Sequence, residues 1–228
     1  MKTTTTDRDR PMIRRTCVRR MLGVLGFLGA SLLASAVPGH AQLAWDTPRL
    51  SGPDRPEGMG VYWLKAGTLP GDGDALLVTW SPPGLGDRIT LRGGAGTGVA
   101  GVSSGFAGLD WRAPIARHAL GHPLDLSWAI GGGVGVGDHV MLSAPIGVSA
   151  GRSWFSGPLW LAPYASLGLA VDVRVGDYGV ADRWSVSPAA DVGLDFSMGT
   201  ARRFVARAAV SLGDRQSFVL GGTVRTLR

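Results

Sequence analysis

The stretch from Leu126 to Ala150 constrains the fold more strongly than any other part of the sequence. It reads LSWAIGGGVGVGDHVMLSAPIGVSA, which contains too many glycines for a helix. At a period of two residues, one face carries large apolar side chains and the other carries small or polar ones. The pattern restarts after the Gly-Asp pair at 137–138. This alternation predicts two β-strands that share one uniformly apolar face.

The same alternation continues through most of the chain that follows. Clusters of glycine, proline and aspartate separate the alternating runs, as turns separate the strands of an antiparallel all-β domain. We count ten candidate strands, at residues 59–66, 74–81, 87–97, 102–113, 124–136, 139–150, 158–175, 183–198, 202–212 and 216–226. The first two are the least regular, so eight strands is the alternative.

The composition of the two faces indicates which solvent each one meets. The small faces hold mostly Gly, Ala and Ser with scattered Asp and Arg, and almost no Lys or Glu. Such residues suit the crowded interior of a narrow barrel. The apolar face would then meet lipid, where closure of the sheet is needed because unpaired backbone groups are not tolerated. The pattern therefore predicts a closed, antiparallel, up-and-down transmembrane β-barrel.

Two groups of side chains follow from this arrangement. A lone buried charge is costly, so we expect the charged residues of the small faces to pair inside the barrel as a lumen charge network. This network comprises Asp172, Arg174, Asp191, Asp195, Arg203, Arg207 and Arg225. Aromatic residues near the strand ends are predicted to form an interfacial girdle, with ordinary core aromatics as the alternative. The girdle comprises Trp80, Trp111, Trp128, Trp154, Trp184, Phe204 and Phe218.

The first 41 residues have the order of a secretory signal peptide. A basic segment is followed by the apolar run 21–37 and by small residues at Gly39 and Ala41. A transmembrane anchor is the alternative. We expect cleavage after Ala41, then a flexible N-terminal arm at 42–57 and the barrel domain at 58–228.

Charge and cysteine content narrow the function classes. The net charge is +6. Residues 1–41 contribute +5 of it and the remaining residues only +1, so no nucleic-acid partner is expected. The one cysteine, Cys17, lies in the leader. The mature chain is therefore expected to have neither a disulfide nor a cysteine metal site.

The leader to Ala41 and the alternating runs between 124 and 226 resemble the small bacterial outer-membrane β-barrel proteins. The resemblance covers roughly residues 58–228 and is one of pattern, without a specific motif. It implies a place in the bacterial outer membrane, contact with its lipid and folding by the outer-membrane insertion machinery. Such barrels often end on an aromatic residue, whereas this chain ends on Leu227 and Arg228.

No motif indicates catalysis. His118 and His122 are spaced like metal ligands, but no third ligand is near them in the sequence, so no metal is expected. The glycine-rich segments 93–98 and 131–137 lack the Lys and Ser/Thr of a nucleotide loop. We therefore predict no enzyme activity and no cofactor.

The predicted function is a structural, adhesive or minor permeation role, with a polar lumen filled by side chains. The alternative is a soluble periplasmic β-barrel whose apolar face points inward and binds an apolar ligand. The sequence leaves the oligomeric state and any adhesion partner open.

Overall fold

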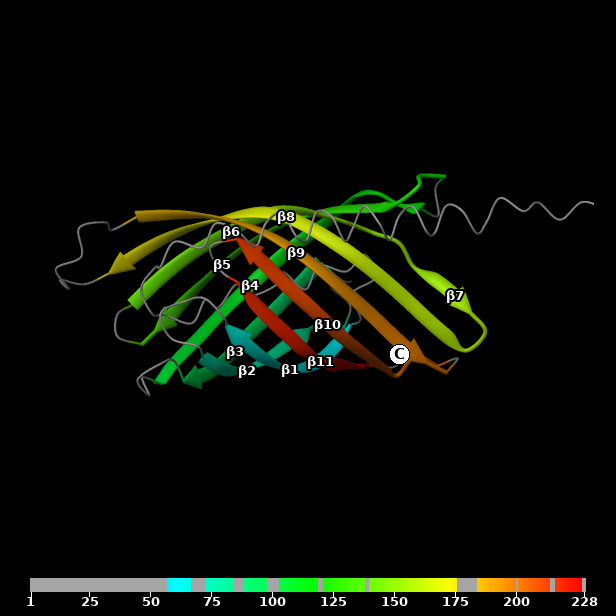
Figure 1. The fold of residues 1–228 in the computed structure, drawn as a ribbon, viewed down its shortest axis with the longest axis horizontal. Helices are drawn as coiled ribbons and strands as arrows, with labels where there is room; N and C mark the ends of the chain where they lie inside the picture. Colours follow the sequence, from blue (N-terminus) through cyan, green and yellow to red (C-terminus); the bar gives the residue numbers. More distant parts are fainter. Residues whose placement is uncertain are drawn as a thin grey trace, which may run out of the picture. The chain divides into compact units, whose positions relative to one another are not determined.

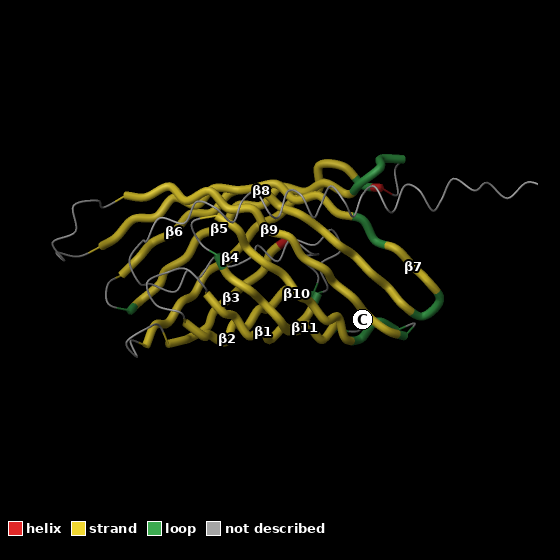
Figure 2. The backbone as a smooth tube through the Cα atoms, viewed as in Figure 1, coloured by secondary structure: helices red, strands yellow, loops and turns green. Residues whose placement is uncertain are grey.

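A computed structural model describes residues 57–66, 73–83, 88–97, 103–118, 121–137, 140–175, 184–199, 201–213 and 216–226. Strands make up nearly all of these residues (Figure 2). The predicted signal peptide and all of the predicted arm except Glu57 lie outside the described residues. No helix in the described part of the chain is long and apolar enough to cross a membrane.

Eleven strands form one antiparallel sheet (Figure 1). They are β1 (Gly58–Ala66), β2 (Gly73–Ser81), β3 (Ile89–Thr97), β4 (Ser103–Ala116), β5 (Asp125–Val136), β6 (Val140–Gly151), β7 (Trp154–Ser156), β8 (Leu159–Val175), β9 (Trp184–Met198), β10 (Phe204–Gly213) and β11 (Ser217–Arg225). Successive strands pair with each other except β6 and β7, which both pair with β8, and β1 pairs with β11. The predicted closed ten-stranded, up-and-down barrel is therefore confirmed, with β7 as a short addition.

The short strand β7 continues β6 in the same register against β8. Gly151 pairs with Tyr164, and three residues later Trp154 pairs with Leu161. Between them the Arg152 amide donates to the carbonyl oxygen of Pro163 at 3.3 Å. Proline has no N–H to return this bond, so the ladder is interrupted at that point. β6 and β7 thus act as one arm of a long hairpin that turns at Gly157, where φ is +58°.

Strand β4 extends further than its sequence pattern predicts. It continues past the predicted end at Ala113 to Ala116, and its pairing with β5 shifts between Pro114 and Ala116. A proline lacks the donor for a regular ladder, and a bulge accommodates it near a strand end. The connection to β5 is accordingly confined to residues 117–124.

Side-chain exposure is the reverse of that in a soluble sheet protein. On β2, for example, Leu76, Val78 and Trp80 are exposed while Ala75 and Thr79 are buried. Large apolar side chains are exposed on every barrel strand, and the most exposed on β8 is Leu167, at 65 %. The buried side chains of the same strands include many serines, threonines, aspartates and arginines. The polar residues thus face the inside of the barrel and the apolar residues face outward.

Part of the interior is apolar, which differs from the predicted small and polar lumen. Tyr62, Leu64, Leu77, Phe106 and Val219 belong to one buried cluster, which also contains Ala75 and Met141. Strands β1 and β2 supply most of it because they carry apolar residues on both faces. This is why these strands show the least regular alternation.

The two ends of the barrel are named from the first and last strands. The terminal end is the end at which β1, β3, β5, β8 and β10 begin and at which β2, β4, β6, β9 and β11 end. The opposite end is the end at which β2, β4, β6, β9 and β11 begin.

Candidate functional site

A fully buried ion pair joins β9 and β10 inside the barrel. Asp195 and Arg207 face each other in register and are 0 % and 2 % exposed. Arg207 donates from Nε and Nη2 to the two carboxylate oxygens of Asp195, so the pair is bidentate. Charge-assisted, bidentate contacts of this kind are among the stronger hydrogen bonds in proteins. The pair satisfies two charges that would otherwise be buried alone.

Beside this ion pair, an aromatic ring packs against a glycine of the neighbouring strand. The Arg207 guanidinium lies 5.5 Å from the centre of the Tyr164 ring. Tyr164 pairs with Gly193, and a Cβ at Gly193 would approach the Tyr164 ring more closely than side-chain atoms ever do. The glycine therefore makes room for the ring inside the barrel.

A row of hydroxyl groups and one carboxylate crosses five neighbouring strands. Ser127, Ser149, Ser166, Asp191 and Ser211 are successive partners in register from β5 to β10. Ser127 and Ser149 are joined by a hydrogen bond of 2.7 Å. The Asp191 carboxylate accepts from Ser166 at 2.7 Å and from Ser211 at 2.5 Å. Hydroxyl donors thus solvate this buried aspartate in place of water.

A second ion pair lies inside the early strands. Arg92 on β3 donates from Nη2 to Asp110 on β4 at 2.6 Å, and both residues are buried. The sequence-based network did not include this pair. The inward parity of both residues in the runs 87–97 and 102–113 would have indicated it.

The seam that closes the barrel is also joined by side chains. Tyr62 on β1 and Thr223 on β11 share a hydrogen bond of 2.5 Å between their hydroxyl groups. Both residues are buried. The contact links the first and last strands, which lie far apart in the sequence.

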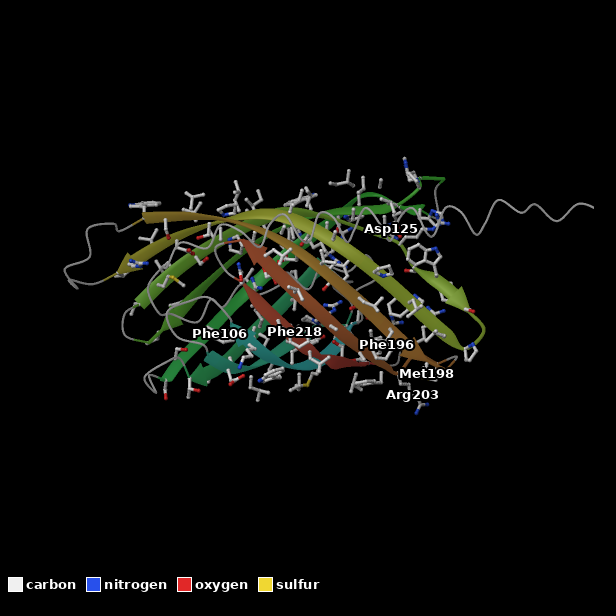
Figure 3. All side chains as sticks on the ribbon, in the orientation of Figure 1. Phe106, Asp125, Phe196, Met198, Arg203 and Phe218 are labelled. Carbon is white, nitrogen blue, oxygen red and sulfur yellow. The ribbon has the colours of Figure 1, made fainter. Side chains whose placement is uncertain are left out.

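The other members of the predicted lumen network occupy different environments. Asp172 is buried on the inner face opposite Ser143, while Arg174 and Arg225 are partly buried. The Arg225 guanidinium lies 5.7 Å from the ring of the buried Trp160. Arg203 does not face the interior as predicted. It precedes β10 in the connection from β9 and is exposed, so its charge is accessible to solvent (Figure 3).

The predicted girdle residues all lie on the outer side, and they are distributed unequally. Six of the seven are exposed and Trp128 is partly exposed. Trp111 and Trp128 contact each other edge to face at 4.8 Å. Toward the terminal end lie Trp80, Trp111, Trp128, Trp154 and Phe204. At the opposite end lie Trp184, the first residue of β9, and Phe218, the second residue of β11. Phe218 contacts Trp63, an outward aromatic that the sequence analysis did not select.

Hydrogen bonds that involve both histidines stabilise the connection between β4 and β5. The His118 amide donates to the Asp125 carboxylate at 2.7 Å, and its Nδ1 donates to the His122 carbonyl oxygen at 2.6 Å. His122 contributes only its backbone carbonyl oxygen, which a residue of any type could supply, so the spacing of the two histidines needs no metal site. Within the described ranges, no three His, Cys, Asp or Glu side chains are grouped as a metal ion would need.

Comparisons with known proteins add little to this description. The chain matches no known protein family and no curated protein. Among solved structures it is similar to a chain described as "KdgM porin", with 10 % identity over 75 % of this chain and 99 % of that one. The TM-score is 0.34. The fold assignment therefore rests on this chain's own strand pairing.

Proposed function

We propose that this protein is a small outer-membrane β-barrel with a structural role, whose lumen is filled by its own side chains. The observation that carries the proposal is the reversed distribution of side chains. Ion pairs and hydroxyl groups lie inside the barrel, while large apolar residues cover the outside of every barrel strand. Monomeric soluble proteins rarely expose contiguous apolar surface of that extent.

The backbone arrangement supports the same conclusion. Every barrel strand has a partner on both sides, so the ring leaves no free sheet edge over the barrel wall. A span through hydrocarbon requires this, because unpaired N–H and C=O groups there have no water to bind. Strands of 9 to 17 residues are long enough to cross the apolar layer when tilted.

A filled lumen argues for a structural role over permeation. Barrels near this size have interiors that side chains can fill. Here bulky buried residues enter from different strands: Tyr62 from β1, Leu77 from β2, Phe106 from β4, Trp160 and Tyr164 from β8 and Arg207 from β10. We infer that these side chains obstruct the path of solutes between the two ends.

The outer membrane is the compartment that this architecture favours, since transmembrane β-barrels are typical of it. The expected signal peptide and the resemblance of the alternating runs support the same location. No pairing of a nucleophile with a base was found in the sequence, and we infer that the barrel is not an enzyme.

The test is to reconstitute the protein and to measure its electrophoretic mobility and its conductance. We expect a band in SDS that runs faster before heating than after, because a closed barrel resists unfolding by detergent. We also expect no steady channels in planar bilayers. Recovery in the soluble periplasmic fraction without a mobility shift would refute the membrane assignment. Regular single-channel steps would refute the sealed lumen alone.

A further inference from the structure

One hairpin extends past its neighbours at the terminal end. Strand β7 pairs with β8 alone, because β5 begins at Asp125, opposite Gly151, and does not continue alongside it. The Gly199 amide donates to the Pro158 carbonyl oxygen at 3.0 Å. This bond ties the hairpin to the connection between β9 and β10. We call residues 152–161 together with 198–199 and 201–203 the rim hairpin (Figure 1).

The rim hairpin carries an arginine beside an aromatic ring on each of its two faces. Arg152 lies 5.9 Å from the centre of the Trp154 ring, and Trp154 lies beside the outward residue Leu161. The other face continues the inner face of the barrel, because Phe155 pairs with the buried Trp160. There the Arg202 guanidinium lies 4.3 Å from the Phe155 ring and 5.9 Å from the Trp160 ring, at the mouth of the barrel. These distances are in the range of cation–π contacts. A third arginine, the exposed Arg203, follows directly.

These three positive charges have no acidic partners in the described part of the chain. The salt bridges there involve Arg92 and Arg207, and no contact joins Arg152, Arg202 or Arg203 to a carboxylate. Apart from the buried Trp160 beside Arg202, the large side chains around them are apolar and exposed. Phe155 is 60 % exposed and Met198 is 75 % exposed, and Met198 and Arg203 lie at the same end of the barrel (Figure 3).

We propose that the rim hairpin binds the phosphate of anionic phospholipid headgroups. The proposal rests on the membrane-embedded barrel proposed above. An exposed aromatic on the outer face, such as Trp154, prefers the boundary between hydrocarbon and headgroups. Arginine stems can lie along apolar surface while the guanidinium reaches the polar layer. A guanidinium binds phosphate through two parallel hydrogen bonds, so three arginines without acidic partners match a layer of phosphates.

The test compares lipids retained by the full-length protein after reconstitution into vesicles that mix phosphatidylglycerol with phosphatidylcholine. After gentle extraction into a non-ionic detergent, native mass spectrometry gives the ratio of the two bound lipids. We expect enrichment of phosphatidylglycerol over its share in the vesicles. Each of Arg152→Gln, Arg202→Gln and Arg203→Gln should lower the enrichment by about fivefold, and the triple variant should abolish it.

The matched control is Arg117→Gln, which removes an exposed arginine at the same end but outside the rim hairpin. It should leave the enrichment unchanged. Equal retention of both lipids by the unaltered protein would overturn the proposal. So would a triple variant that keeps the enrichment, or an Arg117→Gln variant that loses it to the same extent.

The heat-dependent mobility shift is measured on every sample. A parent protein that keeps its shift but shows no lipid preference refutes the rim-hairpin site and leaves the barrel assignment intact. If the parent protein shows no mobility shift, both the rim-hairpin site and the barrel assignment are refuted.

Discussion

At the scale of single residues, Asp195 and Arg207 show how the interior is stabilised. Neither is accessible to solvent, so each charge depends on the other for its solvation. Removing one partner of a buried pair is more damaging than removing both, because the remaining charge is left uncompensated. Close packing adds a second constraint, since rings such as Tyr164 lie against glycines on the next strand.

The ion pair gives the first prediction. Asp195→Ala should reduce the free energy of unfolding in detergent micelles by about 3–5 kcal/mol. The double variant Asp195→Leu with Arg207→Met should lose markedly less. Urea midpoints of the mobility shift measure both effects. If Asp195→Ala were as stable as the parent protein, the ion pair would not stabilise the folded barrel.

The second prediction concerns glycine at a crowded position. Gly193→Ala should reduce stability by about 1–3 kcal/mol, because its Cβ would overlap the Tyr164 ring. Gly132→Ala is the matched control, since nothing lies within 4 Å of a Cβ there. The temperature at which the unheated band disappears compares the two. Equal effects would mean that the Tyr164 ring can move aside.

At the scale of one element, strand β8 presents different surroundings to its two faces. It has 17 residues. Trp160, Ala162, Tyr164 and Ser166 are buried inside, whereas Leu167 and Leu169 are exposed outside. A leucine that points outward into water adds little to the stability of the fold. In hydrocarbon the same side chain is favoured over a polar or charged one.

Strand β8 therefore gives a prediction that depends on depth. Leu167→Arg should cost about 2–4 kcal/mol and impair insertion, because its position lies well inside the strand. Met198→Arg, at the last residue of β9, should cost about 0–1 kcal/mol because it is near the boundary. Yield of heat-modifiable protein in the membrane fraction is the readout. Equal yields for both variants would argue against a lipid-facing β8.

At the scale of the whole molecule, the periodic features could be predicted from the sequence. Alternation in runs such as 124–136 predicts strands and their outward faces, and regular turns predict an even, antiparallel ring. The extra strand β7 could not be predicted, because its separation from β6 comes from Pro163 on the opposite strand. The alternation of apolar and polar residues shows which face of a strand points outward, but it does not show which strand is its partner.

The interior contacts were less predictable for a related reason. Parity places a charged residue on the inner face, but register decides which partner it meets. Asp195 meets Arg207 because β9 and β10 align at that position, and Asp191 instead meets serines. Arg203 shares the inward parity but lies outside β10, where the alternation no longer applies. The apolar inner cluster was missed because β1 and β2 are apolar on both faces.

The central claim is that the outer face of the barrel meets lipid. The single cysteine, Cys17, lies in the predicted signal peptide, so we expect the chain cleaved after Ala41 to carry no thiol that competes with an introduced cysteine. The most direct measurement is the reaction of Leu167→Cys and His122→Cys with a membrane-impermeant maleimide in vesicles opened to the reagent on both sides. The account predicts rapid labelling at position 122, which is exposed in a connection, and strong protection at 167 until detergent or heat unfolds the barrel. Equal labelling at both positions in folded protein would show that Leu167 faces water and would contradict the account.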